Sequence, residues 1–95
     1  MLSKSENDKI CRVGADQPMG RLLRRHWLPA LMADTLKPNG DPELVELAGE
    51  HFVAWRNEQG EVGIFDQACL HRGASMHIAR AEGDGLRCIY HGWKF

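Results

Sequence analysis

The chain has 95 residues, of which 43% are hydrophobic and 26% are charged, a composition typical of one globular domain. Twelve Lys and Arg residues stand against thirteen Asp and Glu residues, which leaves a formal net charge of −1. This balance gives no electrostatic reason to expect nucleic acid or an anionic membrane surface as a partner.

Two features bear on where the protein works. The N-terminal run MLSKSENDKI is polar and does not resemble a signal peptide, and the apolar stretch at residues 27–33 is interrupted by Pro29 and too short to span a bilayer. The chain has three cysteines, and this odd number argues against a disulfide framework and favours a reducing compartment. We therefore expect a cytoplasmic protein without a membrane segment.

The first third of the chain predicts a helix behind a polar arm. Residues 1–15 are polar and are expected to form a loose N-terminal arm. Residues 16–36 are expected to form a helical segment, because Asp16 can cap a helix and Pro18 suits its first turn. Pro29 would end or kink this helix. Its apolar face would consist of residues at helical spacing: Met19, Leu22, Leu23 and Trp27.

Residues 37–95 follow the arm and the helical segment as a third division of the chain, and their sequence predicts a β domain. Residues 37–42 are turn-forming, and strand-like runs follow at 43–48, 51–56 and 61–66, with turn residues between them. A helix followed by short consecutive strands indicates a mostly β fold with antiparallel pairing. Beyond residue 66 the periodicity fades and glycines mark loops.

Those loops carry two short pairs of metal-binding residues. Cys69 and His71 are two positions apart, Cys88 and His91 are three positions apart, and a glycine follows each pair within two residues, at Gly73 and Gly92. Glycine permits tight turns and lets backbone N–H groups approach a negatively charged group. Each loop thus offers one thiolate and one imidazole.

Three interpretations fit this donor set. A tetrahedral Cys₂His₂ zinc site has the right residues, although zinc sites usually group the two Cys in one loop and the two His on a helix. A [2Fe–2S] centre with both Cys on one iron and both His on the other requires the interleaved order seen here. In the third interpretation the four residues are ordinary core or loop residues, since free Cys is often buried.

The two short sequences that contain these pairs, called the ligand boxes below, match a known pattern. They read CLHRG and CIYHGWKF, and they resemble the Rieske [2Fe–2S] domains of the oxygenase subunits of aromatic-ring-hydroxylating, non-haem iron dioxygenases. The flanking text GRLLRRHWLPAL and VELAGEHFVAWRNEQGEVGIFD is similar to the phthalate dioxygenase branch. This resemblance implies that Cys69 and Cys88 bind one iron and that His71 and His91 bind the other. It also implies a mostly β, Rieske-type antiparallel sandwich with an N-terminal helix, incomplete after the second box.

The neighbours of the four candidate ligands are candidates for supporting roles. For Arg72 the interpretations are a pair with an acid, contact with a redox partner, or a solvated loop charge. For Tyr90 they are a hydroxyl near the cluster or simple packing. Gly73 and Gly92 would shape the loops, and Trp93 is expected to pack under them as core, together with Phe95. Residues without a partner at ligand spacing are expected to be incidental: Cys11, His26, His51 and His77.

The resemblance also implies a larger protein. Ring hydroxylation in such enzymes needs a mononuclear Fe(II) held by two His and a carboxylate, and the related motif, Asp-x₂-His-x₄-His, does not occur in the 95 residues. We therefore expect no catalytic residue in this chain. The resemblance implies a reductase or ferredoxin as electron donor, a homo-oligomer (a trimer), and an aromatic substrate bound by a further domain. The alternatives are a stand-alone Rieske-type ferredoxin and a zinc-stabilised interaction module.

Overall fold

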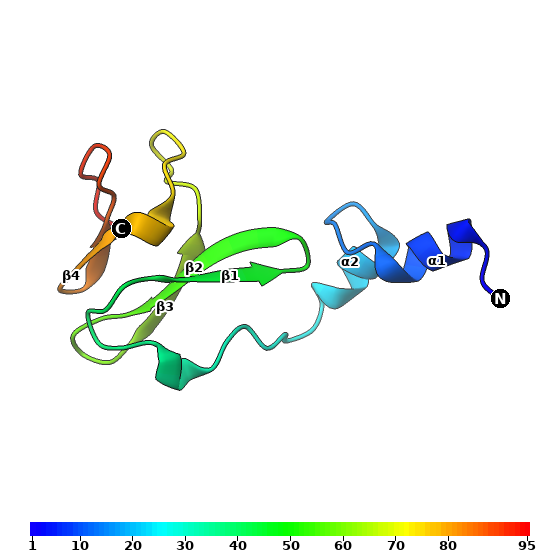
Figure 1. Cartoon of the computed structure of the whole chain (residues 1–95), viewed down its shortest axis with the longest axis horizontal. Coiled ribbons are helices and arrows are strands. Elements are labelled where there is room, and N and C mark those ends of the chain that lie inside the picture. Colours follow the sequence, from blue (N-terminus) through cyan, green and yellow to red (C-terminus); the bar gives the residue numbers. More distant parts are fainter. The chain divides into compact units, whose positions relative to one another are not determined.

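The computed structural model describes all residues, 1–95, and the chain divides into two compact units. The first unit consists of Met1–Ala30 with Glu46–Glu50, and the second consists of Leu31–Val45 with His51–Phe95. No helix is long and apolar enough to cross a lipid bilayer. Figure 1 shows the helices of the first unit in blue and cyan, and the strands and loops of the second in green to red.

The first unit contains two short α-helices, α1 (Lys4–Cys11) and α2 (Pro18–Leu23). The presence of α1 corrects the expectation of a loose arm over residues 1–15. The Ser3 hydroxyl accepts the N–H of Glu6, and the Glu6 carboxylate accepts the N–H of Ser3 in return. Because this reciprocal capping satisfies N–H groups that would otherwise be unpaired, the first turn forms although no residue of α1 is buried.

Helix α2 is shorter than the sequence predicts. Pro18 lies in its first turn as expected, but Gln17 rather than Asp16 is the residue that precedes the helix, and it makes no side-chain cap. The helix ends at Leu23, well before Pro29, because the next N–H groups bond three residues back, from Arg25 to Leu22 and from His26 to Leu23. These bonds tighten the chain into a final turn and stop the α-helix.

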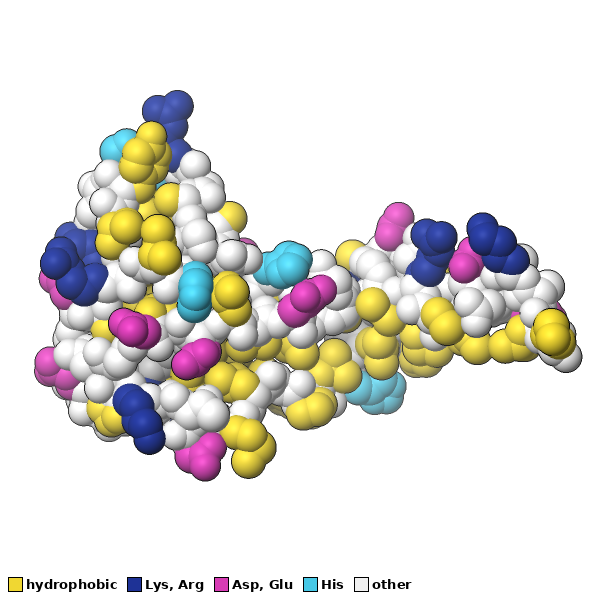
Figure 2. Space-filling model, in the orientation of Figure 1, with side chains coloured by type: hydrophobic (Ala, Val, Ile, Leu, Met, Phe, Trp, Pro, Cys, Tyr) yellow, Lys and Arg dark blue, Asp and Glu magenta, His cyan; other side chains and the backbone are white.

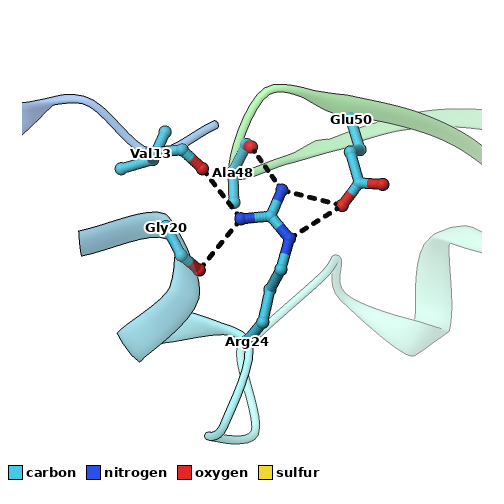
Figure 3. Close-up of polar contacts among 5 residues, drawn as sticks. All are labelled: Val13, Gly20, Arg24, Ala48 and Glu50. Atoms are coloured by element: carbon cyan, nitrogen blue, oxygen red, sulfur yellow. Dashed lines mark hydrogen bonds and ion pairs between the residues drawn. The ribbon is translucent and has the colours of Figure 1, made fainter. Parts of the chain in front are cut away.

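Arg24 holds the first unit together (Figure 3). Its guanidinium donates to the carbonyl oxygens of Val13, Gly20 and Ala48 at 2.8, 2.9 and 3.1 Å, and to the Glu50 carboxylate at 2.9 Å. The helical part of the unit is thereby joined to the segment Glu46–Glu50. Gly20 is needed at this point, since a Cβ on it would overlap the Val13 and Gly14 backbone.

Most strand residues belong to the second unit, and the strand pairs are antiparallel. A three-stranded sheet has the order β1 (Glu43–Leu47), β2 (Glu50–Arg56) and β3 (Val62–Asp66), and a hairpin is formed by β4 (Arg80–Glu82) and β5 (Gly85–Arg87). Two 3₁₀ turns complete the elements, η1 (Ala33–Thr35) and η2 (Met76–Ile78). The prediction of a mostly β fold with antiparallel pairing is confirmed. The bounds of the three predicted divisions, 1–15, 16–36 and 37–95, stay a prediction.

The core lies on one face of the sheet, under the loops. Val53 pairs with Phe65 and Trp55 with Gly63 across β2 and β3, so their side chains share a face. Gly63 leaves room for the Trp55 indole, because a Cβ there would lie 3.0 Å from its Nε1 atom. The buried cluster consists of Val53, Trp55, Cys69, Met76, Ala79, Leu86 and Cys88. Both loop cysteines therefore belong to the core.

The three tryptophans lie in three different surroundings. The side chain of Trp27, beyond α2, is fully exposed, whereas that of Trp55 is 3% exposed in the core. Trp93, in the last loop, is half exposed. The expectation that Trp93 packs as core is therefore wrong, while Phe95 packs partly buried against the core as expected.

Candidate metal centre

Two loops of the second unit have the same backbone turn. The first ligand loop is Cys69–Ala74, in which the N–H of Cys69 donates to the Ala74 carbonyl and the N–H of Gly73 to the Cys69 carbonyl, both at 2.8 Å. The second ligand loop is Cys88–Trp93. It repeats the pattern, from Cys88 to Trp93 at 2.8 Å and from Gly92 to Cys88 at 2.9 Å. The two loops lie side by side in Figure 1, in yellow and red.

Each turn depends on its glycine. Gly73 has φ of 74° and Gly92 has φ of 80°, which is the left-handed region that side-chain-bearing residues rarely adopt. A Cβ at either position would meet no atom within 4 Å, so the requirement is for the backbone conformation and not for space.

The two cysteines approach each other in the core. Cys69 is 5% exposed, Cys88 is 3% exposed, and neither forms a disulfide. The pKa of the Cys88 thiol is lowered, first by the backbone N–H of Tyr90 and further by hydrogen bonds from the Cys69 thiol and the His91 N–H, against the opposing effect of burial. The N–H groups of the second loop thus already favour a negative sulfur at this position.

The two histidines also meet, but at the surface. The rings of His71 and His91 have centroids 4.7 Å apart at an angle of 75°, and both residues are exposed. Tyr90 is exposed too, and its ring lies 3.9 Å from that of His91. In the structure, Tyr90 contacts His91 through its ring and the Cys88 sulfur through its backbone N–H. A role for its hydroxyl stays a prediction.

The end of the unit that carries these loops exposes large apolar side chains. Figure 2 shows hydrophobic, His and basic side chains together on this part of the surface. Arg72 is exposed and forms no ion pair, so the expected acidic partner within the chain is not found. The exposed apolar side chains of the two loops are Leu70, Ile89, Tyr90 and Trp93.

The remaining His and Cys residues lie outside the ligand loops. The side chains of His26, His51 and His77 are exposed. Cys11 is exposed at the end of α1, where its thiol donates to the Asn7 side chain at 3.5 Å.

The four loop residues form two pairs, and this arrangement tests which metal group they fit. No group of three or more His, Cys, Asp or Glu side chains converges as a single metal ion requires. Instead, thiol meets thiol and imidazole meets imidazole. A tetrahedral zinc ion needs four donors around one point, whereas a [2Fe–2S] group with a Cys₂ iron and a His₂ iron needs two such pairs. The donor set and its pairing fit the two-iron group.

One residue at this site was not predicted from the sequence. Arg87, directly before Cys88, donates from Nη1 to the Gly92 carbonyl at 2.6 Å and from Nε to the Glu82 carboxylate. The available signal was a basic residue next to the second ligand box, which is too common to single out. Only the folded loop brings residues 87 and 92 together.

Comparisons with known proteins identify the family of the chain. The sequence profile of the Rieske [2Fe–2S] domain matches residues 26–95, and the chain belongs to this family. The chain is 46% identical over 95 residues to the 3-chlorobenzoate-3,4-dioxygenase oxygenase subunit of Comamonas testosteroni. It is also 46% identical over 95 residues to the phthalate 4,5-dioxygenase oxygenase subunit of Pseudomonas putida. These matches confirm the predicted resemblance to the phthalate dioxygenase branch.

The matches cover nearly all of this chain but a small part of each relative. The alignments include 100% and 99% of the chain, which spans 22% of the length of both relatives. Among solved structures, an oxygenase–ferredoxin complex of carbazole 1,9a-dioxygenase is similar with a TM-score of 0.63 and 26% sequence identity. That match covers 74% of this chain and 18% of the solved one.

Proposed function

We propose that this chain binds a Rieske [2Fe–2S] cluster and transfers single electrons through it. Cys69 and Cys88 hold one iron, and His71 and His91 hold the other. The observation that carries this proposal is the pairing of two buried thiols and two exposed imidazoles by loops of identical turn geometry. When bound, such a cluster accepts and releases one electron at a time.

Different residues of the chain have different roles at the cluster. The core around Cys69 and Cys88 keeps water from the sulfur side, and the N–H groups of Tyr90 and His91 stabilise the negative charge on the second sulfur. His71 and His91 form the exposed side, where electrons enter or leave. The apolar side chains around them, with the unpaired Arg72, suit contact with another protein.

We further propose that the whole protein is the oxygenase subunit of an aromatic-ring-hydroxylating dioxygenase, acting in the cytoplasm in the breakdown of aromatic compounds. A reductase or ferredoxin would supply the electrons, as the ferredoxin complex of the carbazole enzyme suggests. A mononuclear iron and the aromatic substrate would be held by residues outside these 95, in a homotrimer. The names of the two oxygenase subunits compared above support this proposal.

The test is to load the 95-residue chain with iron and sulfide under anaerobic conditions and to reduce it with dithionite. We expect iron and sulfide in equal amounts and an EPR signal of low average g-value. Cys88→Ser and His91→Ala should lose this signal, whereas Cys11→Ser is the matched control and should keep it, since Cys11 lies outside the ligand loops. A colourless chain that binds one zinc ion would contradict the proposal.

A further inference from the structure

The two ligand loops share a backbone turn but are preceded by different residues. Residue 68, before the first loop, is Ala, whereas residue 87, before the second, is Arg. Arg87 donates to the carbonyl of Gly92, the left-handed glycine that closes the second turn. In the first loop, no side chain donates to the equivalent carbonyl of Gly73. Only in the second loop does the side chain of the preceding residue bond to the glycine that closes the turn.

Glu82 fixes the direction of the Arg87 guanidinium. Its carboxylate, on the neighbouring strand β4, accepts from Arg87 Nε, while Nη1 remains aimed at the Gly92 carbonyl. Hydrogen bonding to Arg87 is also the main cause of the lowered pKa of Glu82, so this carboxylate is ionised near neutral pH. Both side chains of this pair are 36% exposed, about half the exposure of the Arg80 side chain on the same hairpin.

Arg80 offers a natural comparison on the same hairpin. It lies opposite Arg87 in the β4–β5 register, and its Nε is 3.7 Å from the same Glu82 carboxylate. Its side chain is 72% exposed and makes no hydrogen bond to the loop. The two arginines thus share a partner and a charge but differ in contact with the second ligand loop.

We propose that Arg87 is a positioning residue for the cluster: held by Glu82, it clamps the second ligand loop and places a positive charge beside the metal site. This inference rests on the proposed function. Reduction adds one electron to the site, and a nearby guanidinium favours the added negative charge. The clamp should also slow the opening of the loop that carries Cys88 and His91, because a guanidinium can bond two acceptors in a fixed geometry.

The experiment compares variants of the full 95-residue chain loaded with iron and sulfide. The midpoint potential is measured by EPR-monitored redox titration, and loop opening is measured by amide hydrogen exchange at Gly92. Arg87→Gln should shift the equilibrium between the reduced and oxidised forms about threefold to tenfold toward the oxidised form. A tenfold shift corresponds to 59 mV for a one-electron couple. The Gly92 amide should exchange several-fold faster.

Three further variants separate charge from clamp. Arg87→Lys keeps the charge, so the potential should stay near the wild-type value while exchange at Gly92 still becomes faster. Glu82→Gln releases the Arg87 guanidinium from its partner, so the Gly92 amide should exchange faster than in wild type. Arg80→Gln is the matched control and should change neither quantity, since its charge is exposed and screened by water.

The outcomes distinguish this inference from the proposed function. If the wild-type chain gives no Rieske-type signal, the proposed function fails. If the wild-type signal is present and Arg87→Gln matches wild type in potential and in exchange, the positioning role is wrong. If Arg87→Gln does not retain its metal, Arg87→Lys and Glu82→Gln decide: faster exchange at Gly92 in both variants supports the inference, and exchange at the wild-type rate overturns it.

Discussion

The indole of Trp93 lies almost parallel to the imidazole of His71, with ring centroids 4.3 Å apart and an angle of 10° between the planes. The two residues come from different ligand loops, so this stack connects the loops at their exposed end. His71 also meets His91 edge-on, which leaves its ring in contact with an aromatic neighbour on two sides. The tilt of the His71 ring is therefore set by the second loop as well as by its own.

Replacing Trp93 should loosen the His71 side of the centre. Aromatic pairs contribute about 0.5–1.5 kcal/mol beyond their buried area. We expect Trp93→Ala to lose its iron to a chelator about two- to tenfold faster than wild type, measured by the decay of visible absorbance. Trp93→Phe should retain most of the wild-type lifetime, and Trp27→Phe should behave as wild type because Trp27 is fully exposed. An unchanged lifetime in Trp93→Ala would show that the stack does not hold the ring.

The core beneath the loops should be sensitive to the loss of single side chains. Leu86, the middle residue of β5, is completely buried in the core cluster. Leu86→Ala should lower the free energy of unfolding by about 2–5 kcal/mol, the usual range for a buried leucine. Urea denaturation checks this value. Leu44→Ala is the control, because Leu44 is about half exposed and its loss should cost about 0.5 kcal/mol or less. Equal effects of the two changes would refute the assignment of the core.

The first unit should depend on Arg24. Its side chain is 26% exposed, and its guanidinium donates to carbonyl groups from three separate segments. Arg24→Gln should therefore increase amide hydrogen exchange in α2 by about tenfold, which corresponds to roughly 1.4 kcal/mol for lost hydrogen bonds to a charged group. Arg25→Gln is a matched control, because Arg25 is exposed and its side chain makes no hydrogen bond. The prediction fails if both variants exchange alike.

Helix α1 should respond to acid through Glu6. The N–H of Ser3, followed by its hydroxyl, lowers the pKa of the Glu6 carboxyl below its usual value. A carboxyl with a lowered pKa stabilises the folded form above its unfolded pKa of about 4.3, and this contribution is lost as the pH falls through the folded value. NMR signals of α1 should therefore weaken in acid along with the Glu6 titration. Ser3→Ala should raise the Glu6 pKa toward the unfolded value; an unchanged pKa would count against the capping.

The strands could be predicted from the sequence because their signals are local. The expected runs at 43–48, 51–56 and 61–66 correspond to β1, β2 and β3 within one residue at each end. Alternating side chains fixed the strands, and turn residues such as Gly60, with φ of 87°, fixed their ends. Helix α1 was missed because its residues are polar all round, although the capping signal of Ser3 and Glu6 was present in the sequence.

The candidate site shows the same division between local and distant information. The ligand boxes, with the glycines that follow them, can be read as short motifs. The stack of Trp93 on His71 and the clamp of Arg87 on Gly92 depend on how the loops fold and lie against each other. No spacing rule encodes these contacts, so the sequence predicted Trp93 as core and left Arg87 without a role.

The different surroundings of the three tryptophans give the protein its own set of optical reporters. Emission from the buried Trp55 should lie at shorter wavelength and report on core packing, while the exposed Trp27 reports on the segment that follows α2. Trp93 lies against His71, where bound iron would quench its fluorescence. Loading of the metal centre, unfolding of the β domain and changes after α2 can thus be followed separately in chains that retain one tryptophan each, without an attached dye.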